Sequence, residues 1–213
     1  MASEQGRTAR EGTGRGTYAV GDARRRKILD TAVEHFAQWG FHASSLARIA
    51  KECGITQGGL LHHFRGKEDL LLSVLAQSEE RDIERLFAVP AETTAAYWDT
   101  LVSLVEDNAR RPGIVRMFSV LVGESADPAH PAHAYFRQRY ARVLDHTVGV
   151  LRAGRERGEL RADLDLEAVG RELLAVMDGL QIQWLLDPEA VDMAAGVRAH
   201  LDRLMLWAAP PAG

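Results

Sequence analysis

The sequence lacks the features that mark several classes of protein. Cys53 is its only cysteine, so no internal disulfide can form, and a disulfide-stapled extracellular scaffold is excluded. No run approaches the roughly 18 apolar residues that a membrane-spanning helix requires. The opening stretch MASEQGRTAREGTGRGT has no apolar segment of the kind that a secretory signal contains. We therefore expect a cytoplasmic protein without a membrane partner.

What is present indicates a folded chain with an uneven distribution of charge. The 213 residues are 46% hydrophobic and 26% charged, with a formal net charge of −4, which excludes disorder throughout. Residues 1–70 hold 11 Lys and Arg against 8 Asp and Glu, whereas residues 71–213 hold 15 against 22. Because a basic patch on one part of a protein is enough to meet a phosphate backbone, the N-terminal part is the candidate for contact with nucleic acid.

The first segment of the chain differs in composition from the rest. Residues 1–21 are rich in Gly, Thr and Arg and have no apolar period, so we predict a flexible basic arm. Asp22 can cap a helix that runs to about Trp39, because its apolar residues recur at helical spacing. Gly40 can end that helix.

Two short helices are expected next. Ser44 or Ser45 can cap the first, and Gly54 can end it. Thr56 can cap the second. A turn containing glycine between two short helices is the spacing of a helix-turn-helix. The predicted helix-turn-helix domain therefore comprises residues 22–66.

The remainder, residues 67–213, is predicted to be a larger helical domain. Apolar residues recur at helical spacing, and no stretch alternates with period 2 for long enough to make a strand. The expected helices cover about 67–87, 93–110, 114–124, 131–157, 165–186 and 189–207. The predicted fold class is all-α.

No motif of enzymatic chemistry is present. A Walker loop, G-x-S-x-G, HExxH and a dinucleotide-binding fingerprint are all missing. Asp163 and Asp165 lie in a turn, where capping the next helix is the simpler use. His130 and His133 lack a third metal ligand, and Pro131 lies between them. We expect no enzyme activity, no cofactor and no bound metal.

Residues 23–72 resemble the DNA-binding domain of the TetR family of transcriptional regulators, through ILDTAVEHFAQWGFHASSLARIAKECGITQGGLLHHFRGKEDLL. The rest resembles the BetI-like ligand-binding domains of that family, mainly in Asp178-Gly179-Leu180 and the later Leu185-Leu186-Asp187-Pro188. The resemblance implies a homodimer that binds a pseudo-palindromic DNA operator. It also implies release of the operator when a small molecule enters the larger domain.

The resemblance and the expected helices place polar and basic residues toward DNA. These are Arg24, Arg25, Ser44, Ser45, Arg48, Thr56, Gln57, Gly58, His62, His63 and Lys67. Thr56 can offer its hydroxyl to a phosphate at the start of a helix, and Gln57 can make a bidentate contact with adenine. The resemblance assigns Lys67 a phosphate contact.

Other uses of these residues remain open. The two histidines can be packed or solvated, and the arginines can belong to a solvated helix start. Leu60, Phe64 and Cys53 are expected in the core. Gln57, Gly59 and Leu61 stand where many family members have Lys, Thr and Tyr, and Leu61 cannot hydrogen-bond a phosphate. No operator sequence is therefore carried over from the family.

Two further sets of residues are candidates in the larger domain. A ligand pocket is predicted among Trp98, Leu101, Met117, Phe118, Leu121, Tyr135, Tyr140, Met177 and Trp184. A dimer interface between the helices at 131–157 and 165–186 is predicted to use Val143, Thr147, Val150, Val176, Leu180, Gln183 and Trp184. Ordinary core is the alternative for each set, because apolar residues at helical spacing usually pack inside.

Together these observations lead to a functional hypothesis. The protein is expected to be a repressor that leaves its operator when a small, mostly apolar effector binds between the helices of the larger domain. The helix beginning at Lys67 would carry the change to the DNA-binding domain. The alternative is the same DNA-binding domain acting as an activator or controlled by a protein partner; an apolar cavity would favour a ligand.

Overall fold

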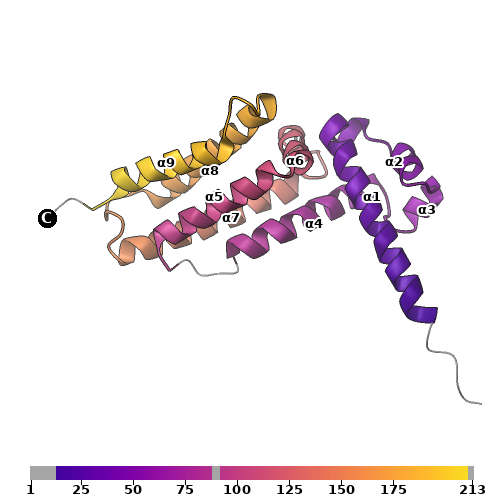
Figure 1. Ribbon diagram of the computed structural model, residues 1–213, viewed down its shortest axis with the longest axis horizontal. Helices are drawn as coiled ribbons and strands as arrows, with labels where there is room; N and C mark the ends of the chain where they lie inside the picture. The colour runs from indigo at the N-terminus through magenta and orange to yellow at the C-terminus, as the bar shows by residue number, and fades with distance from the viewer. Residues whose placement is uncertain (1–12, 88–91, 211–213) are drawn as a thin grey trace, which may run out of the picture.

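The computed structural model describes residues 13–87 and 92–210, and in those ranges every regular element is a helix (Figure 1). The helices are α1 (Thr13–Ala43), α2 (Leu46–Glu52), α3 (Gln57–Leu61), α4 (Lys67–Phe87), α5 (Thr94–Ala109), α6 (Pro112–Glu124), α7 (His133–Glu156), α8 (Leu166–Leu186) and α9 (Met193–Ala208). The all-α prediction is confirmed.

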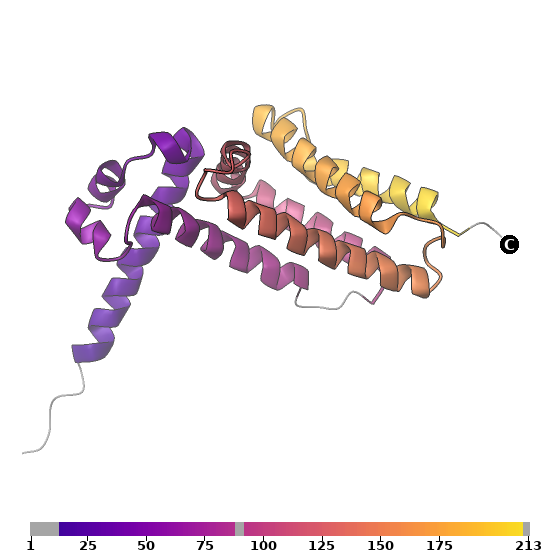
Figure 2. The same cartoon turned by 180° about the vertical axis from the view of Figure 1, so that it is seen from behind.

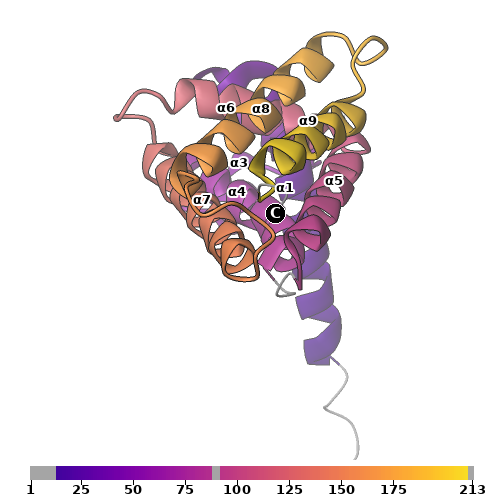
Figure 3. The same ribbon diagram turned by 90° about the vertical axis from the view of Figure 1, so that its left-hand side faces the viewer.

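The helices form a head, α1–α3, and an elongated body, α4–α9 (Figure 1). α6 lies at the junction and packs on α1. Seen from behind, α7 runs beside α4 (Figure 2), where the Arg142 guanidinium donates to Glu79 at 2.6 Å. Seen along the body, α8 lies between α7 and α9, and α9 also contacts α5 (Figure 3).

Short polar side chains fix where several helices begin. Thr56, Thr93, Asp165 and Asp192 each accept a hydrogen bond from a backbone amide in the first turn of the following helix, at 2.9–3.1 Å. These bonds satisfy amides that have no partner within the helix. The predicted caps Thr56 and Asp165 are confirmed.

The start of α1 differs from the prediction. The helix begins at Thr13, so Asp22 lies within it, and the carbonyl of Asp22 accepts from the Arg26 side chain at 3.5 Å. Extending an existing helix costs far less than nucleating one, and no proline precedes Asp22 to stop the extension. Part of the predicted arm, 1–21, is therefore helical; residues 1–12 lie outside the described ranges.

Two hydrophobic clusters form the core. The first joins the head to α4, α6 and the start of α7, and it contains Leu60, Phe64 and Cys53, which are 0%, 1% and 6% exposed. The second lies among α5, α7, α8 and α9. The three predicted core residues are confirmed, and packing is continuous across the expected boundary between residues 66 and 67.

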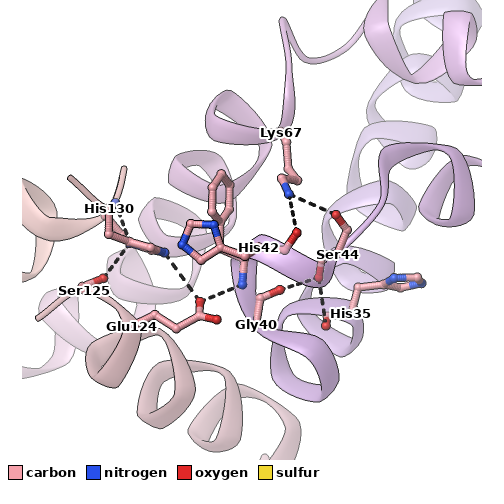
Figure 4. Close-up of polar contacts among 10 residues, drawn as sticks. His35, Gly40, His42, Ser44, Lys67, Glu124, Ser125 and His130 are labelled. Atoms are coloured by element: carbon pink, nitrogen blue, oxygen red, sulfur yellow. Dashed lines mark hydrogen bonds and ion pairs between the residues drawn. The ribbon is translucent and has the colours of Figure 1, made fainter. Parts of the chain in front are cut away.

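The Glu124 carboxylate of the body is hydrogen-bonded to the head immediately after Gly40. Gly40 has φ 68° and ψ −172°, which breaks the helical path of α1 before its last residues. The next amide, that of Phe41, donates to the Glu124 carboxylate at 2.7 Å (Figure 4). Glu124 is the last residue of α6, so this bond joins the end of α6 to the beginning of the helix-turn-helix.

His130 completes this joint. Its ring is 4% exposed and lies 5.2 Å from the ring of Phe41. Nδ1 accepts from the Ala132 amide at 3.2 Å, which places the ring proton on Nε2, 3.5 Å from the Glu124 carboxylate. Burial lowers the pKa of His130, although Glu124 opposes that effect.

We predict that Gly40→Ala destabilises the protein more than Gly158→Ala does. Both glycines have positive φ, 68° and 78°, so each alanine adds strain of about 1 kcal/mol. A Cβ at Gly40 would also overlap the Glu124 carboxylate, whereas nothing lies within 4 Å of one at Gly158. We expect total losses of about 3 and 1 kcal/mol in urea-unfolding experiments. Equal losses of unfolding free energy for the two variants would show that the Glu124 carboxylate can move away from an alanine at position 40 without destabilising the protein.

Candidate DNA-binding surface and effector cavity

One side of α3 faces solvent with polar groups while the other is buried. Thr56, Gln57, Gly58 and His62 are exposed, and His63 is partly exposed. Leu60 and Phe64 anchor the opposite side in the core. The hydroxyl of Thr56 accepts from the Gly59 amide at 3.0 Å, so its oxygen already caps the helix.

Basic side chains lie on the neighbouring helices. Arg24 and Arg25 on α1 and Arg48 and Lys51 on α2 are exposed. The Arg25 guanidinium lies 4.8 Å from the centre of the Phe64 ring, directly after α3. The Arg48 guanidinium lies 5.1 Å from the centre of the Trp39 ring. Because such stacking orders a long side chain, both cations are held close to the head surface.

The structure gives two predicted DNA contacts an internal role. Ser44 is 5% exposed and its hydroxyl donates to the carbonyls of Gly40 and His35, so its side chain is withdrawn from DNA. Ser45, the residue before α2, makes no side-chain cap bond. Lys67 Nζ donates to the carbonyls of His42 and Ser44 at 3.0 and 3.1 Å, as Figure 4 shows.

These bonds explain why a cation opens α4. The Lys67 ammonium also lies 4.5 Å from the centre of the Phe41 ring. It therefore fastens the start of α4 to the turn between α1 and α2, whatever contact it makes with DNA. Two further side chains, which the sequence pattern did not single out, secure α2: Lys27 Nζ donates to the Cys53 carbonyl at 3.1 Å, and His35 Nε2 lies 3.0 Å from the Glu52 carboxylate.

The predicted apolar pocket does not form as one site. Met117, Phe118, Leu121 and Tyr135 pack in the first core cluster, whereas Trp98, Leu101, Met177 and Trp184 pack in the second. The helical period indicates which residues turn inward, but it does not indicate which core they join.

A small cavity lies instead where α5, α6, α7 and α8 meet. Its volume is about 60 Å³. It is lined by Asn108, Ile114, Val115, Phe118, Val122, Arg139, Tyr140, Asp178 and Gln181. Phe118 and Tyr140 are the members of the predicted set that reach it. Several lining groups are polar or charged, so the lining is more polar than the sequence predicted.

Polar contacts organise this cavity. The Tyr140 hydroxyl donates to the Asp178 carboxylate at 2.6 Å, and Gln181 donates to the Ser119 hydroxyl at 2.9 Å. Burial, followed by the nearby carboxylate, raises the pKa of Tyr140. Burial likewise raises the pKa of Asp178, although the Tyr140 hydrogen bond and the charge of Arg139 oppose the effect.

The family can now be identified from comparisons with known proteins. The model described as "Bacterial regulatory proteins, tetR family" matches residues 28–74. The model described as "BetI-type transcriptional repressor, C-terminal" matches residues 90–206. The chain belongs to the TetR family of transcriptional regulators. The predicted resemblance is confirmed, and TetR-family members are DNA-binding regulators rather than enzymes.

Individual proteins agree with this assignment. The HTH-type transcriptional regulator SrpR of Pseudomonas putida is 31% identical over 153 residues, which cover 72% of this chain and 71% of SrpR. A transcriptional regulator of Saccharomonospora viridis in complex with choline has a TM-score of 0.69 at 24% identity, covering 87% of this chain and 96% of that one. SmeT of Stenotrophomonas maltophilia, in complex with triclosan, has a TM-score of 0.76 at 20% identity, covering 89% and 93%.

The predicted dimer residues of this TetR-family chain on α7 are buried or partly buried. Thr147 is 1% exposed, and its hydroxyl lies 2.8 Å from that of Tyr97 on α5. Val143 and Val150 pack against the second core cluster, as do Leu180 and Trp184 on α8. Predicting Thr147 at an interface was therefore wrong, because that face of α7 turns toward α5.

The outer faces of α8 and α9 are more exposed. Gln183, from the predicted set, is exposed, and Val176 is partly exposed. Ile182 and Leu186 on α8 are 52% and 81% exposed, and Leu206 on α9 is 81% exposed. These exposed apolar side chains are the signal for a protein–protein interface. Sequence periodicity could not supply that signal, because it does not show which of two apolar faces of a helix is left exposed after folding.

The described residues contain neither a cluster of metal-binding side chains nor a helix suited to span a membrane. In residues 13–87 and 92–210, no group of three or more His, Cys, Asp and Glu side chains is arranged to hold a metal ion. Over the same ranges, none of the helices combines the length and apolar character needed to cross a membrane.

We predict that the unfolding free energy of Asp178→Asn, relative to that of wild type, increases as the pH is raised. Burial raises the pKa of Asp178 in the folded state, so folding favours the protonated acid, and wild-type stability falls once pH exceeds the ordinary aspartate value of about 3.9. The amide carries no such penalty and can still accept from Tyr140.

The measurement is urea unfolding of both proteins between pH 4 and pH 7. The difference in unfolding free energy, variant minus wild type, should increase across this range. Asp145→Asn makes the same chemical change at an exposed position on α7, so it is the matched control and should show little change. A difference that stays constant with pH would contradict the predicted effect of burial.

Proposed function

We propose that this protein is a homodimeric repressor that binds a palindromic operator and releases it when a small molecule occupies the cavity of the body. The observation that carries the DNA-binding part is the exposed face of α3, with Gln57 and His62 outward and Leu60 and Phe64 anchored in the core. The basic side chains of α1 and α2 beside it suit phosphate contacts.

The proposed dimer is two-fold symmetric because a palindromic operator presents two symmetry-related half-sites. Two copies of α3 can read two half-sites if they lie about one DNA turn apart, roughly 34–36 Å. We place the interface on the exposed faces of α8 and α9, which are adjacent along one side of the body (Figure 3). Ile182, Leu186 and Leu206 give those faces the apolar groups that a self-complementary contact needs.

α6 provides a path from the cavity to the head. Phe118 and Val122 line the cavity, and Glu124, at the end of the same helix, accepts from the Phe41 amide. A ligand that shifts α6 would therefore displace the turn before α2. This path supplements the one through Lys67 and α4. A coupling of 1–3 kcal/mol would weaken operator binding about 5–150-fold.

A ligand-controlled switch is favoured over the alternative of a protein partner. The cavity is polar instead of apolar, but it lies against α6, the helix that packs on the head, so a polar ligand bound there would act on that helix. The fold neighbours from S. viridis and S. maltophilia were solved with choline and triclosan, respectively. The two molecules differ in polarity, so they support small-molecule control without indicating the effector.

The primary test is selection of duplex DNA from a randomised library, followed by titration of the selected sequence across a salt series. We expect an inverted repeat with half-sites one helical turn apart and affinity that falls steeply with salt. Selection of no sequence, or of a single half-site, would overturn the proposal of a dimer on a palindromic operator.

We predict that Gln57→Ala changes the selected sequence, because the carboxamide is the group on α3 best suited to read adenine. Discrimination at one base pair in each half-site should fall by about 1–3 kcal/mol. Lys51→Ala on exposed α2 is the contrasting variant, and it should weaken all sequences alike and reduce the salt dependence. An unchanged preference in Gln57→Ala would exclude Gln57 as a base-reading residue.

We predict that Ile182→Glu separates the dimer. Placing a carboxylate at the proposed apolar contact leaves it desolvated and unpaired, which disfavours association. Sedimentation analysis should show monomers for this variant. Leu72→Glu is the control, since Leu72 is 40% exposed on α4, away from α8 and α9. A dimer that survives Ile182→Glu as well as Leu72→Glu would place the interface elsewhere.

A further inference from the structure

The partly buried Asp178 carboxylate in the cavity makes few polar contacts with the other described residues. It accepts from Tyr140, and none of the ion pairs among the described residues includes it. A carboxylate has about four sites that can accept hydrogen bonds, and even partial removal from water makes an unpaired charge less favourable. Asp178 therefore leaves room for a ligand that donates hydrogen bonds and carries positive charge.

Arg139, which lines the same cavity, is a cation that lacks a hydrogen-bond acceptor for one N–H group in the described part of the chain. That group is its Nε, which is buried. The nearest carboxylate oxygen, on Glu79, is 3.9 Å away, too far for a hydrogen bond. The guanidinium lies 5.3 Å from the centre of the Phe118 ring, which also lines the cavity. Arg139 is thus positioned to donate to a ligand that brings an acceptor.

The charges around the cavity balance without a ligand. Glu79 is 7% exposed and receives the Arg142 guanidinium at 2.6 Å. That pair leaves one carboxylate, Asp178, and one guanidinium, Arg139, as the incompletely paired groups. A ligand of single charge would satisfy one of them and leave an excess charge in this partly buried region, where the Arg139 side chain is 28% exposed, which is unfavourable. A ligand with one group of each sign satisfies both and keeps the sum at zero.

The size of the cavity limits the ligand further. Its volume of about 60 Å³ is far below the roughly 300 Å³ or more of a site for a drug-sized ligand. The amides of Asn108 and Gln181, which also line it, add neutral hydrogen-bonding groups. The space therefore suits a molecule of a few heavy atoms and not an extended apolar one.

We propose that the effector is a small zwitterion, whose ammonium group binds Asp178 and Tyr140 and whose carboxylate binds Arg139. This inference rests on the proposed function, because it names the chemical class of the ligand in the same cavity. It replaces the mostly apolar effector that the sequence predicted.

The test compares three probes that share a three-carbon skeleton: 3-aminopropanoate, propylamine and propanoate. Each is added to the full-length protein at up to about 100 mM, and binding is measured as the rise in melting temperature, since a ligand of the folded state stabilises it. Glycine and 4-aminobutanoate vary the distance between the two charges. At least one zwitterion should bind tenfold or more tightly than both single-charge probes.

Two variants make the test specific to charge. Asp178→Asn leaves Arg139 in excess, so it should lose the preference for the zwitterion and gain affinity for propanoate. Arg139→Gln leaves Asp178 in excess and should gain affinity for propylamine. A merely structural role of either residue would not exchange the preferred probe. Asp145→Asn, at an exposed position on α7, is the control and should keep the wild-type order of probes.

The results separate this inference from the proposed function. If no zwitterion raises the melting temperature, or if either single-charge probe binds wild type as tightly, the zwitterion proposal is wrong. Operator binding is measured separately by fluorescence anisotropy without probe, and its absence would refute the repressor instead. A zwitterion that binds but leaves operator affinity unchanged would refute its role as effector.

Discussion

The hydrogen bond from the Phe41 amide to the Glu124 carboxylate is the contact on which the relation of head to body depends. It forms because Gly40 adopts a left-handed φ and leaves room for the carboxylate where any Cβ would intrude. His130 backs the same carboxylate, and Lys67 holds the other side of the turn. Since the first core cluster is continuous from α1 to α6, the head cannot reorient without disturbing this joint. A shift of α6 would therefore also move the proposed DNA-reading surface.

The cavity lies on the same helix and has a cost in stability. Partial burial of the Asp178 carboxylate without an ion pair among the described residues opposes folding and raises its pKa, although the Tyr140 hydrogen bond and the charge of Arg139 oppose that rise. An apolar residue there would pack more favourably. A binding site that retains such a group is consistent with a protein that gains the missing interaction from a ligand. The Phe41–Glu124 hydrogen bond and the cavity that contains Asp178 thus both involve α6, the element proposed to move.

The sequence predicted local features well and long-range ones poorly, for physical reasons. Most helix bounds and the caps Thr56 and Asp165 depend on neighbours within a few residues, so the sequence pattern was sufficient for them, although it missed the start of α1 at Thr13. The partner of Thr147 is Tyr97, and the acceptor for Lys67 is a carbonyl of another helix; no local period encodes either. The cavity is harder still to predict, since Arg139 on α7 and Asp178 on α8 come to line the same space only after four helices pack. The DNA-facing set came largely from resemblance, and Ser44 shows that a matching position can still turn inward.

The helicity of α3, the proposed recognition helix, depends on packing that includes the body. α3 has five residues, two of them glycine, and each glycine costs up to about 1 kcal/mol in a helix. So short a segment is not stable alone. Its geometry is maintained by the Thr56 cap and by burial of Leu60 and Phe64 in the cluster that includes α6 residues Met117 and Leu121. A change in the packing of α6 therefore alters both the placement of α3 and the core that keeps it helical, so an effector could weaken DNA binding through either.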